Sequence, residues 1–190
     1  MIADAIEFIR KEVRRRLGIA DGEVLAIPAR ALADAANTPG VCISLINLQE
    51  ETALRNTPHA ERRALPLGSE ARYLEPPVFL NLYLLFAFNF PNYATSLVHL
   101  SKTIELFQSK TWFSSSTQTG PGALPFPSTL EKLVFALENL RFEELNNLWS
   151  MLGGTHFPSV VYKVRMVKVQ LAETSPVPEV RAIELNTVIR

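Results

Sequence analysis

Apolar and polar residues alternate most clearly over Val78–Phe90, and this alternation predicts the central strand of a sheet. The even positions are all large and apolar, whereas the odd positions mix apolar with polar side chains. Successive side chains of a strand point to opposite faces of the sheet, so the even face should lie in the core. The odd face, with Phe79, Tyr83 and Leu85, should be covered by another part of the chain or by a neighbouring subunit.

Three other stretches have the pattern of strands. Val41–Asn47 alternates, in a pattern that can continue to Thr52, and Leu133–Leu137 gives a shorter strand. The last strand covers Ser159–Leu171, and its apolar positions change phase near Met166. Because one extra residue returns later side chains to the inward face, we expect a bulge at this point.

Helical periodicity predicts three helices. The first covers Ile2–Leu17 and ends at Gly18. The second follows Pro91, whose missing N–H costs nothing in a first turn, and should end near Trp112. The third begins at Phe142 and ends at Gly153-Gly154. The expected core-facing stripes are Ile2, Ile6, Ile9, Val13 and Leu17, then Tyr93, Leu97, Leu100, Ile104 and Phe107, and finally Phe142, Leu145, Leu148, Trp149 and Leu152. Trp149 suits either core or interface, and its helical spacing favours the core.

These elements predict an α/β fold of the α+β type. A mainly antiparallel sheet of about four strands should pack against two to three helices, in the order α-β-β-α-β-α-β. Val24–Ile27 is compatible with a short additional strand, while Asn56–Leu74 and Ser114–Ser128 have the composition of long loops. We expect one globular domain over residues 1–171. Residues 172–190 should form a tail, either a loose end or an arm that adds a strand to another subunit.

Composition and charge argue against several classes of function. The 19 basic and 19 acidic side chains cancel, whereas nucleic-acid binders usually carry a basic surplus, so we expect no nucleic-acid partner. The basic run Arg14-Arg15-Arg16 fits a solvated last helical turn better than a patch for an acidic partner. Pro76–Ser101 has no charged residue, but prolines and asparagines interrupt it, so we expect no membrane span. A single cysteine and no signal-peptide pattern indicate a cytoplasmic site of synthesis and assembly.

No residue pattern indicates catalysis, a cofactor or a metal ion. His59, His99 and His156 lack ligand spacing, and Cys42 fits a buried strand thiol better than half of a cysteine–histidine dyad. The adjacent pair Glu50-Glu51 points apart on a strand. The pair Glu143-Glu144 suits the positive end of a helix. We therefore expect a protein that is not an enzyme and has no catalytic, cofactor-binding or metal-binding residues.

Four stretches of the sequence resemble one protein family. The first is Leu45-Ile46-Asn47 with Glu50-Glu51 and Leu54-Arg55-Asn56, and the second runs from Glu75-Pro76-Pro77 through Asn81 and Tyr83 to Tyr93. The third is Leu100-Ser101, Ile104 and Phe107-Gln108. The fourth is Phe142–Trp149, then Leu152-Gly153, Pro158-Ser159 and Tyr162–Arg165. Together, over about residues 2–171, they resemble the N-terminal domain of the cap, or tube-terminator, proteins of extracellular contractile injection systems, which are phage-tail-like particles.

The resemblance implies a structural subunit without catalytic residues. It implies a ring, expected as a hexamer, that seats on the last ring of the inner tube, contacts the sheath and sets or stabilises tube length. The implied partners are the tube protein, the sheath protein and further copies of the chain, with assembly in the cytoplasm and residence in a particle that can be released. Two alternatives remain open: another tail-completion or connector protein, and a small enzyme with an unrecognised site.

Overall fold

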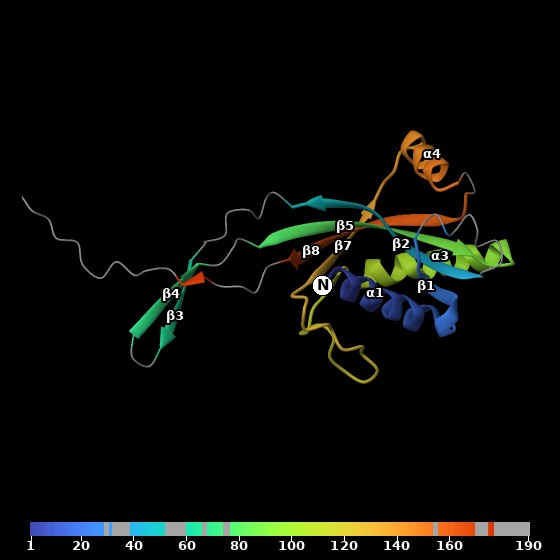
Figure 1. Cartoon of the computed structure of the whole chain (residues 1–190). Coiled ribbons are helices and arrows are strands. Elements are labelled where there is room, and N and C mark those ends of the chain that lie inside the picture. Colours follow the sequence, from blue (N-terminus) through green and yellow to red (C-terminus); the bar gives the residue numbers. More distant parts are fainter. Residues whose placement is uncertain are drawn as a thin grey trace, which may run out of the picture.

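The fold is built on a six-stranded mixed sheet with helices on both faces (Figure 1). The computed structural model describes residues 1–28, 31, 39–51, 60–65, 68–73, 77–153, 156–169 and 175–176. The strand order is β1-β2-β5-β8-β7-β6. The strands are β1 (Val24–Ala26), β2 (Gly40–Glu50), β5 (Val78–Asn89), β6 (Trp112–Phe113), β7 (Leu133–Glu138) and β8 (Ser159–Val169). The helices are α1 (Ile2–Leu17), α3 (Tyr93–Ser109) and α4 (Phe142–Met151).

The α+β class is confirmed, but the expected sheet of about four mainly antiparallel strands is wrong in detail. The sheet is mixed, because β1 pairs with β2 in parallel while the other neighbours are antiparallel. It is also wider than expected, since β1 and β6 add a short strand at each edge. Strand β1 agrees with the short additional strand suggested by Val24–Ile27, whereas β6 has only two residues and is too short for alternation to distinguish it from a loop.

Strand β5 occupies the centre of the sheet, as its alternation predicts. Its register with β8 shifts between Leu80 and Leu82, which pair with Val167 and Val164. Two residues of β8 therefore face one residue of β5, and the predicted bulge near Met166 is confirmed. A second register shift lies in β2, between Leu45 and Asn47.

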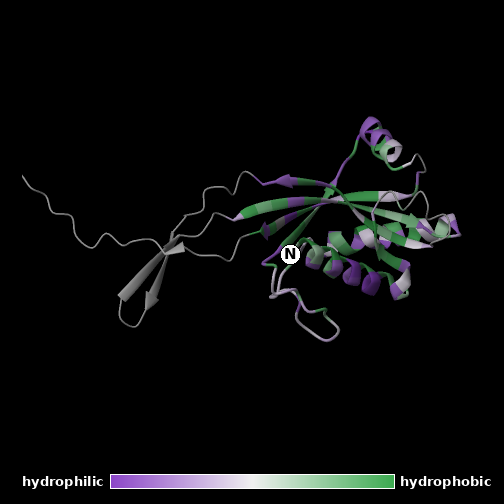
Figure 2. Ribbon diagram, in the orientation of Figure 1, coloured by the Kyte–Doolittle hydropathy of each residue, from purple (hydrophilic) through white to green (hydrophobic). Residues whose placement is uncertain are grey.

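Helices α1 and α3 cover the face of the sheet that carries the even residues of β5 (Figure 1). Leu82, Leu84, Phe86 and Phe88 are buried there in one core cluster with residues of both helices. Figure 2 shows hydrophobic colour along the strands and hydrophilic residues on the outer side of α1. Helix α1 ends at Gly18, whose φ of 68° is the left-handed conformation that suits glycine at a helix end. The predicted packing of this face is confirmed.

The predicted stripe of α3 is wrong for most of its positions. The buried residues are Ser96, His99, Thr103, Leu106 and Phe107, whereas Tyr93, Leu97 and Ile104 are exposed. The buried hydroxyls are satisfied locally, because Thr103 donates to the His99 carbonyl at 2.9 Å and the Phe90 amide donates to the Ser96 Oγ at 3.1 Å. Counting apolar residues misses a face built from small, satisfied polar side chains. Pro91 also lies outside the first turn where it was expected, because it precedes the N-cap Asn92, whose side chain accepts from the Ala94 amide.

Helix α4 packs on the opposite face of the sheet (Figure 1). Its buried residues Leu148 and Trp149 contact a second cluster that contains Cys42, Leu85 and Ala87. Part of the odd face of β5 is therefore covered by this chain itself, and the core assignment of Trp149 is confirmed. The predicted core-facing stripe of α4 is wrong at Phe142, because this first residue of the helix is 91% exposed.

The loop predicted over Asn56–Leu74 contains a hairpin. Strand β3 (Ala60–Leu65) pairs antiparallel with β4 (Gly68–Tyr73), and β4 pairs with β9 (Ser175–Pro176). These strands form a small sheet of their own. The remainder of that predicted loop, and most of residues 172–190, lie outside the described residues.

Candidate functional site: the open half of the sheet

Cys42 and the two described histidines lie apart from one another in the described part of the chain. Burial raises the pKa of the Cys42 thiol to about 11, so it is protonated at neutral pH. His99 is buried on α3 against Phe90, with ring centroids 4.6 Å apart. His156 contacts Trp149 through its ring, and His59 lies outside the described residues. Among the described residues, no three or more His, Cys, Asp or Glu side chains form a group that could hold a metal ion.

The carboxylate pairs Glu50-Glu51 and Glu143-Glu144 lie in different parts of the fold. Glu144 accepts a hydrogen bond at 2.8 Å from the amide of Arg141, the N-cap residue that precedes α4, so it stabilises the helix start. Glu51 instead lies directly after β2 and accepts a 3.0 Å hydrogen bond from Arg165 of β8. It also accepts one at 3.2 Å from the Asn81 side chain of β5. Glu51, at the end of β2, is thus hydrogen-bonded to side chains of both β5 and β8.

This connection lies on the half of the α4 face that α4 leaves uncovered. In the sheet register, Asn47 pairs with Tyr83, Tyr83 with Lys163 and Lys163 with Ala136, so these side chains form one row across four strands. We call this row, together with the next one formed by Gln49, Asn81, Glu51 and Arg165, the open half of the sheet. Its polar composition contrasts with the buried, apolar half beneath α4.

Hydrogen bonds and one cation–π contact hold the open half in place. The Tyr83 hydroxyl donates to the Gln49 side chain at 2.9 Å, and the Lys163 ammonium lies 5.7 Å from the centre of the Tyr83 ring. Asn81 is buried, and its Oδ1 has no hydrogen-bond partner in the described residues. A buried amide oxygen without a donor costs free energy, so Asn81 lowers the stability of this part of the sheet.

Three of the four stretches that carry the family resemblance meet on this surface. Asn47 and Glu51 belong to the first stretch, Asn81 and Tyr83 to the second, and Lys163 and Arg165 to the fourth. Sequence reasoning did not assign them a common role, because they lie on different strands and their proximity depends on sheet order. The sequence alone does not show that these residues lie on the same face of the sheet.

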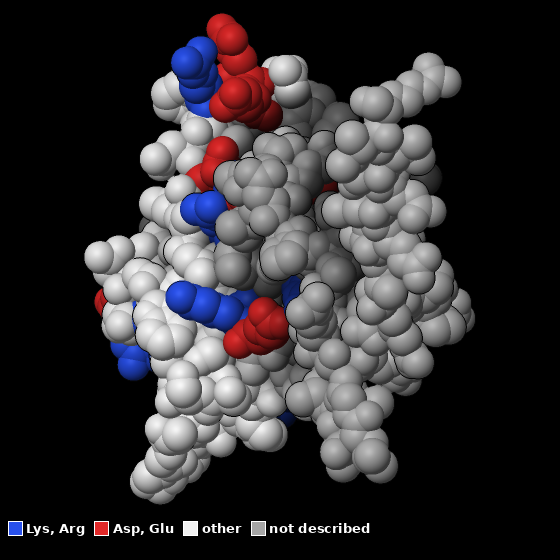
Figure 3. Space-filling view, turned by 90° about the vertical axis from the view of Figure 1, so that its left-hand side faces the viewer, with Lys and Arg blue, Asp and Glu red and all other residues white. Residues whose placement is uncertain are grey.

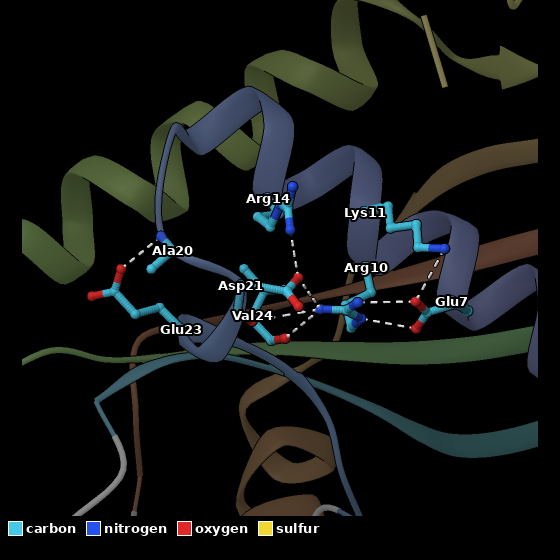
Figure 4. Close-up of polar contacts among 8 residues, drawn as sticks. All are labelled: Glu7, Arg10, Lys11, Arg14, Ala20, Asp21, Glu23 and Val24. Carbon is cyan, nitrogen blue, oxygen red and sulfur yellow. Dashed lines mark hydrogen bonds and ion pairs between the residues drawn. The ribbon is translucent and has the colours of Figure 1, made fainter. Parts of the chain in front are cut away.

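The N-terminal helix carries a second charged surface, which is tied to the turn that follows it (Figure 4). Arg10 forms ion pairs with Glu7 at 2.8 Å and with Asp21 at 2.9 Å, and Arg14 reaches Asp21 at 2.6 Å. Hydrogen bonds from Arg10 and then Arg14 lower the pKa of Asp21. Arg15 and Arg16 pair with Glu12 and Glu105. The basic run Arg14-Arg15-Arg16 is therefore held at the end of α1 by acidic neighbours.

Charge of one sign does not dominate the described surface in Figure 3, where acidic and basic side chains lie next to one another. No helix among the described residues is long and apolar enough to cross a membrane. The described part of the uncharged stretch, residues 77–101, contains strand β5 and the beginning of helix α3. The described residues thus present a polar sheet face and exposed apolar residues on α4.

The sequence matches the family model described as the Pvc16 N-terminal domain over residues 4–182. The chain belongs to this family. Two solved structures have the same fold. One is the PVC sheath/tube terminator of an extracellular contractile injection system in its extended state, with a TM-score of 0.64 and 17% identity. The other is the anti-feeding prophage cap, described as a tube terminating cap, with a TM-score of 0.69 and 13% identity.

The alignments cover nearly all of this chain but less of the two known chains. They include 99% of this chain and 64% of the PVC terminator, and 98% of this chain and 62% of the prophage cap. The Pvc16 N-terminal domain fold therefore accounts for less than two thirds of each known protein. A comparison with curated proteins gave no match.

Proposed function

We propose that this chain is a structural subunit that terminates the inner tube of a contractile injection particle. The observation that carries the proposal is its membership of the Pvc16 N-terminal domain family over residues 4–182. The terminator and cap structures that share its fold support the same role. In this proposal the subunit forms a six-membered ring on the tube end, contacts the sheath and limits tube length. It acts by binding and not by catalysis, and it requires no cofactor.

The proposed organisation is a globular domain over residues 1–171 followed by a tail over residues 172–190. Assembly takes place in the cytoplasm, and the subunit then stays in the finished particle. The open half of the sheet is the proposed contact with the tube or sheath, because it is polar, held in place by hydrogen bonds and uncovered by α4. An interface of this kind gains specificity from matched hydrogen bonds more than from apolar area.

Electron microscopy of particles made without this gene tests the proposed role. A particle that lacks its terminator should show tubes of uncontrolled length or sheaths that do not stay extended. Particles of normal length and stability from the deletion strain would rule out the terminator role. Labelled protein found at the opposite end of the tube would indicate a connector instead.

Charge reversal on the open half tests the proposed surface separately. Lys163→Glu changes a half-buried cation beside Tyr83, whereas Lys102→Glu changes a half-buried cation on α3, on the other side of the sheet. Both variants should fold, and only Lys163→Glu should reduce incorporation into particles. Equal incorporation of the two variants would remove the open half from the interface.

A further inference from the structure

Helix α4 begins with a large apolar side chain that the rest of the described chain does not cover. Phe142 is 91% exposed, and it stands at the start of a helix on the outside of the sheet (Figure 1). Glu143 follows it and forms no hydrogen bond or ion pair with any described residue. Phenylalanine is among the residue types most often buried, and aromatic side chains are enriched at protein–protein interfaces. We call Phe142 and Glu143 the α4 knob.

On the opposite side of the sheet, a groove runs between α1 and the segment from Leu124 to Thr129. Its volume is about 770 Å³, and its apolar lining is provided by Phe8, Leu124, Pro125 and Pro127. The segment is held against α1 because the Phe126 ring packs edge-on to Phe8, with centroids 5.1 Å apart. A pocket of this size exceeds one side chain and can accept an aromatic residue together with its neighbours.

The charges at the groove leave a cation available for an acidic ligand. Lys11, Arg14 and Arg15 line the groove together with Asp4 and Glu7. Asp4 is already bound by the N-terminal amine and Thr129, each at 2.7 Å. Both carboxylate oxygens of Glu7 accept hydrogen bonds from Arg10 at 2.8 and 2.9 Å, whereas Lys11 is 3.4 Å from Glu7. Lys11 is therefore the least committed cation, and its half-exposed ammonium suits a carboxylate such as Glu143.

We propose that the α4 knob of one subunit docks in the α1 groove of a second copy of this chain. Phe142 enters the apolar part of the groove, and Glu143 lies near Lys11. This inference rests on the proposed function, since it names the contact that joins neighbouring subunits of the ring. The occupant is a second copy because the knob and the groove match in apolar character and in charge.

The positions of the two surfaces determine what kind of assembly results. The knob and the groove lie on opposite faces of the sheet, so one chain cannot satisfy its own groove (Figure 1). The contact joins different surfaces on the two copies, and each added subunit exposes a new knob and a new groove. Such head-to-tail contacts produce a ring when the rotation closes. This one contact can therefore build a ring wall if the rotation between successive copies closes, and an open filament if it does not.

Disulfide cross-linking of the full chain tests the contact. A Phe142→Cys chain is mixed with a Pro125→Cys chain, and the matched control replaces Phe142→Cys with Met151→Cys. Met151 is at the other end of the same helix and is 77% exposed, so its thiol is accessible but lies away from the knob. The natural Cys42 can remain, because it is buried. The mixtures are oxidised as concentrated protein alone and after co-expression with the other particle proteins.

We expect a covalent dimer of the Phe142→Cys and Pro125→Cys chains, at least about tenfold more abundant than with the Met151→Cys control. The double variant, with both cysteines in one chain, should give a ladder of oligomers. Absence of a preferred cross-link in both preparations would overturn the inference. A cross-link from Phe142→Cys to a tube or sheath protein would overturn it as well. Incorporation of the control chain into particles decides the proposed function independently of this result.

A charge exchange provides a second test that does not depend on thiols. Glu143→Lys and Lys11→Glu should each weaken self-association about tenfold, because each places like charges together. The double variant Lys11→Glu with Glu143→Lys should recover most of the loss. Thermal unfolding followed by circular dichroism checks that each chain remains folded. Failure of the double variant to recover association, with all chains folded, would refute the pairing of these two residues.

Discussion

Leu82 provides the most direct test of the fold, because it lies at the middle of the central strand and is 0% exposed. Its neighbours across the ladder are Leu48 of β2 and Val164 of β8. Leu48 lies on the same face of the sheet but is 42% exposed, beyond the cover of the helices. The two leucines thus form a matched pair in which chemistry and strand geometry agree and only burial differs.

The expected loss of stability at Leu82 follows from its burial. Truncation of a fully buried leucine to alanine costs about 2–5 kcal/mol, so Leu82→Ala should lower the free energy of unfolding by about 3 kcal/mol. For a chain of this size that corresponds to a fall in Tm of about 6–12 °C. Leu82→Asp adds the cost of a buried carboxyl group without a partner, and its total loss of about 5 kcal/mol or more is comparable with the stability of a whole domain.

Urea unfolding followed by circular dichroism measures the effect, with soluble yield as a second readout. We expect Leu82→Asp to be insoluble or unfolded. Leu48→Asp should stay within about 1 kcal/mol of the wild type, because its side chain already reaches water. A soluble Leu82→Asp protein with wild-type stability would refute the assignment of the even face of β5 to the core. Equal losses at Leu82 and Leu48 would refute the burial argument.

Three further predictions concern single residues. Gly40→Ala should lose about 1–3 kcal/mol in urea unfolding, since Gly40 has a φ of 144° and a Cβ there would strike the Glu23 carbonyl, whereas Gly22→Ala meets nothing nearby and should be neutral. Cys42→Ala should leave particle assembly unchanged, and the folded wild-type thiol should react with Ellman's reagent only on unfolding. Desolvation, with a smaller effect of Lys102, lowers the pKa of His99 against a weaker opposing effect of Glu23, so the unfolded chain binds the proton more readily. Stability should therefore fall as the pH drops below about 6.5, until the folded pKa is reached, and His99→Gln should flatten that part of the profile.

Each of these outcomes has a clear contrary result. Equal stability of Gly40→Ala and Gly22→Ala would contradict the clash with Glu23. Loss of assembly in Cys42→Ala with an unchanged Tm would reveal a role for the thiol. An unaltered pH profile in His99→Gln would show that other groups control acid sensitivity.

The local elements of this protein could be predicted from its sequence because they depend on short-range geometry. Alternation along Val78–Phe90 identified β5, and the change of phase near Met166 identified the bulge that the register of β8 contains. Helix α1 and its glycine stop followed in the same way. Where a periodic pattern extends over ten or more residues, backbone geometry alone relates sequence to structure.

The helix faces were less predictable, because what covers a side chain is decided elsewhere in the chain. The sequence places Tyr93 and Phe142 on apolar stripes, but both are exposed. The buried face of α3 contains Ser96 and Thr103, whose hydroxyls are satisfied by local hydrogen bonds. The hydrophobic pattern of a helix cannot predict these faces, because it does not show which side chains the neighbouring layer covers.

The sequence by itself determined the main strands, the helices and the stretches that carry the resemblance to the terminator family. Only the tertiary structure decided which of them meet. Sheet order brings Glu51, Asn81 and Arg165 together from strands that are far apart along the chain. It also places α4 and α1 on opposite faces, which makes head-to-tail association possible. The physical reason is that strand pairing and layer packing depend on long-range contacts, which a pattern with a period of two or 3.6 residues does not encode.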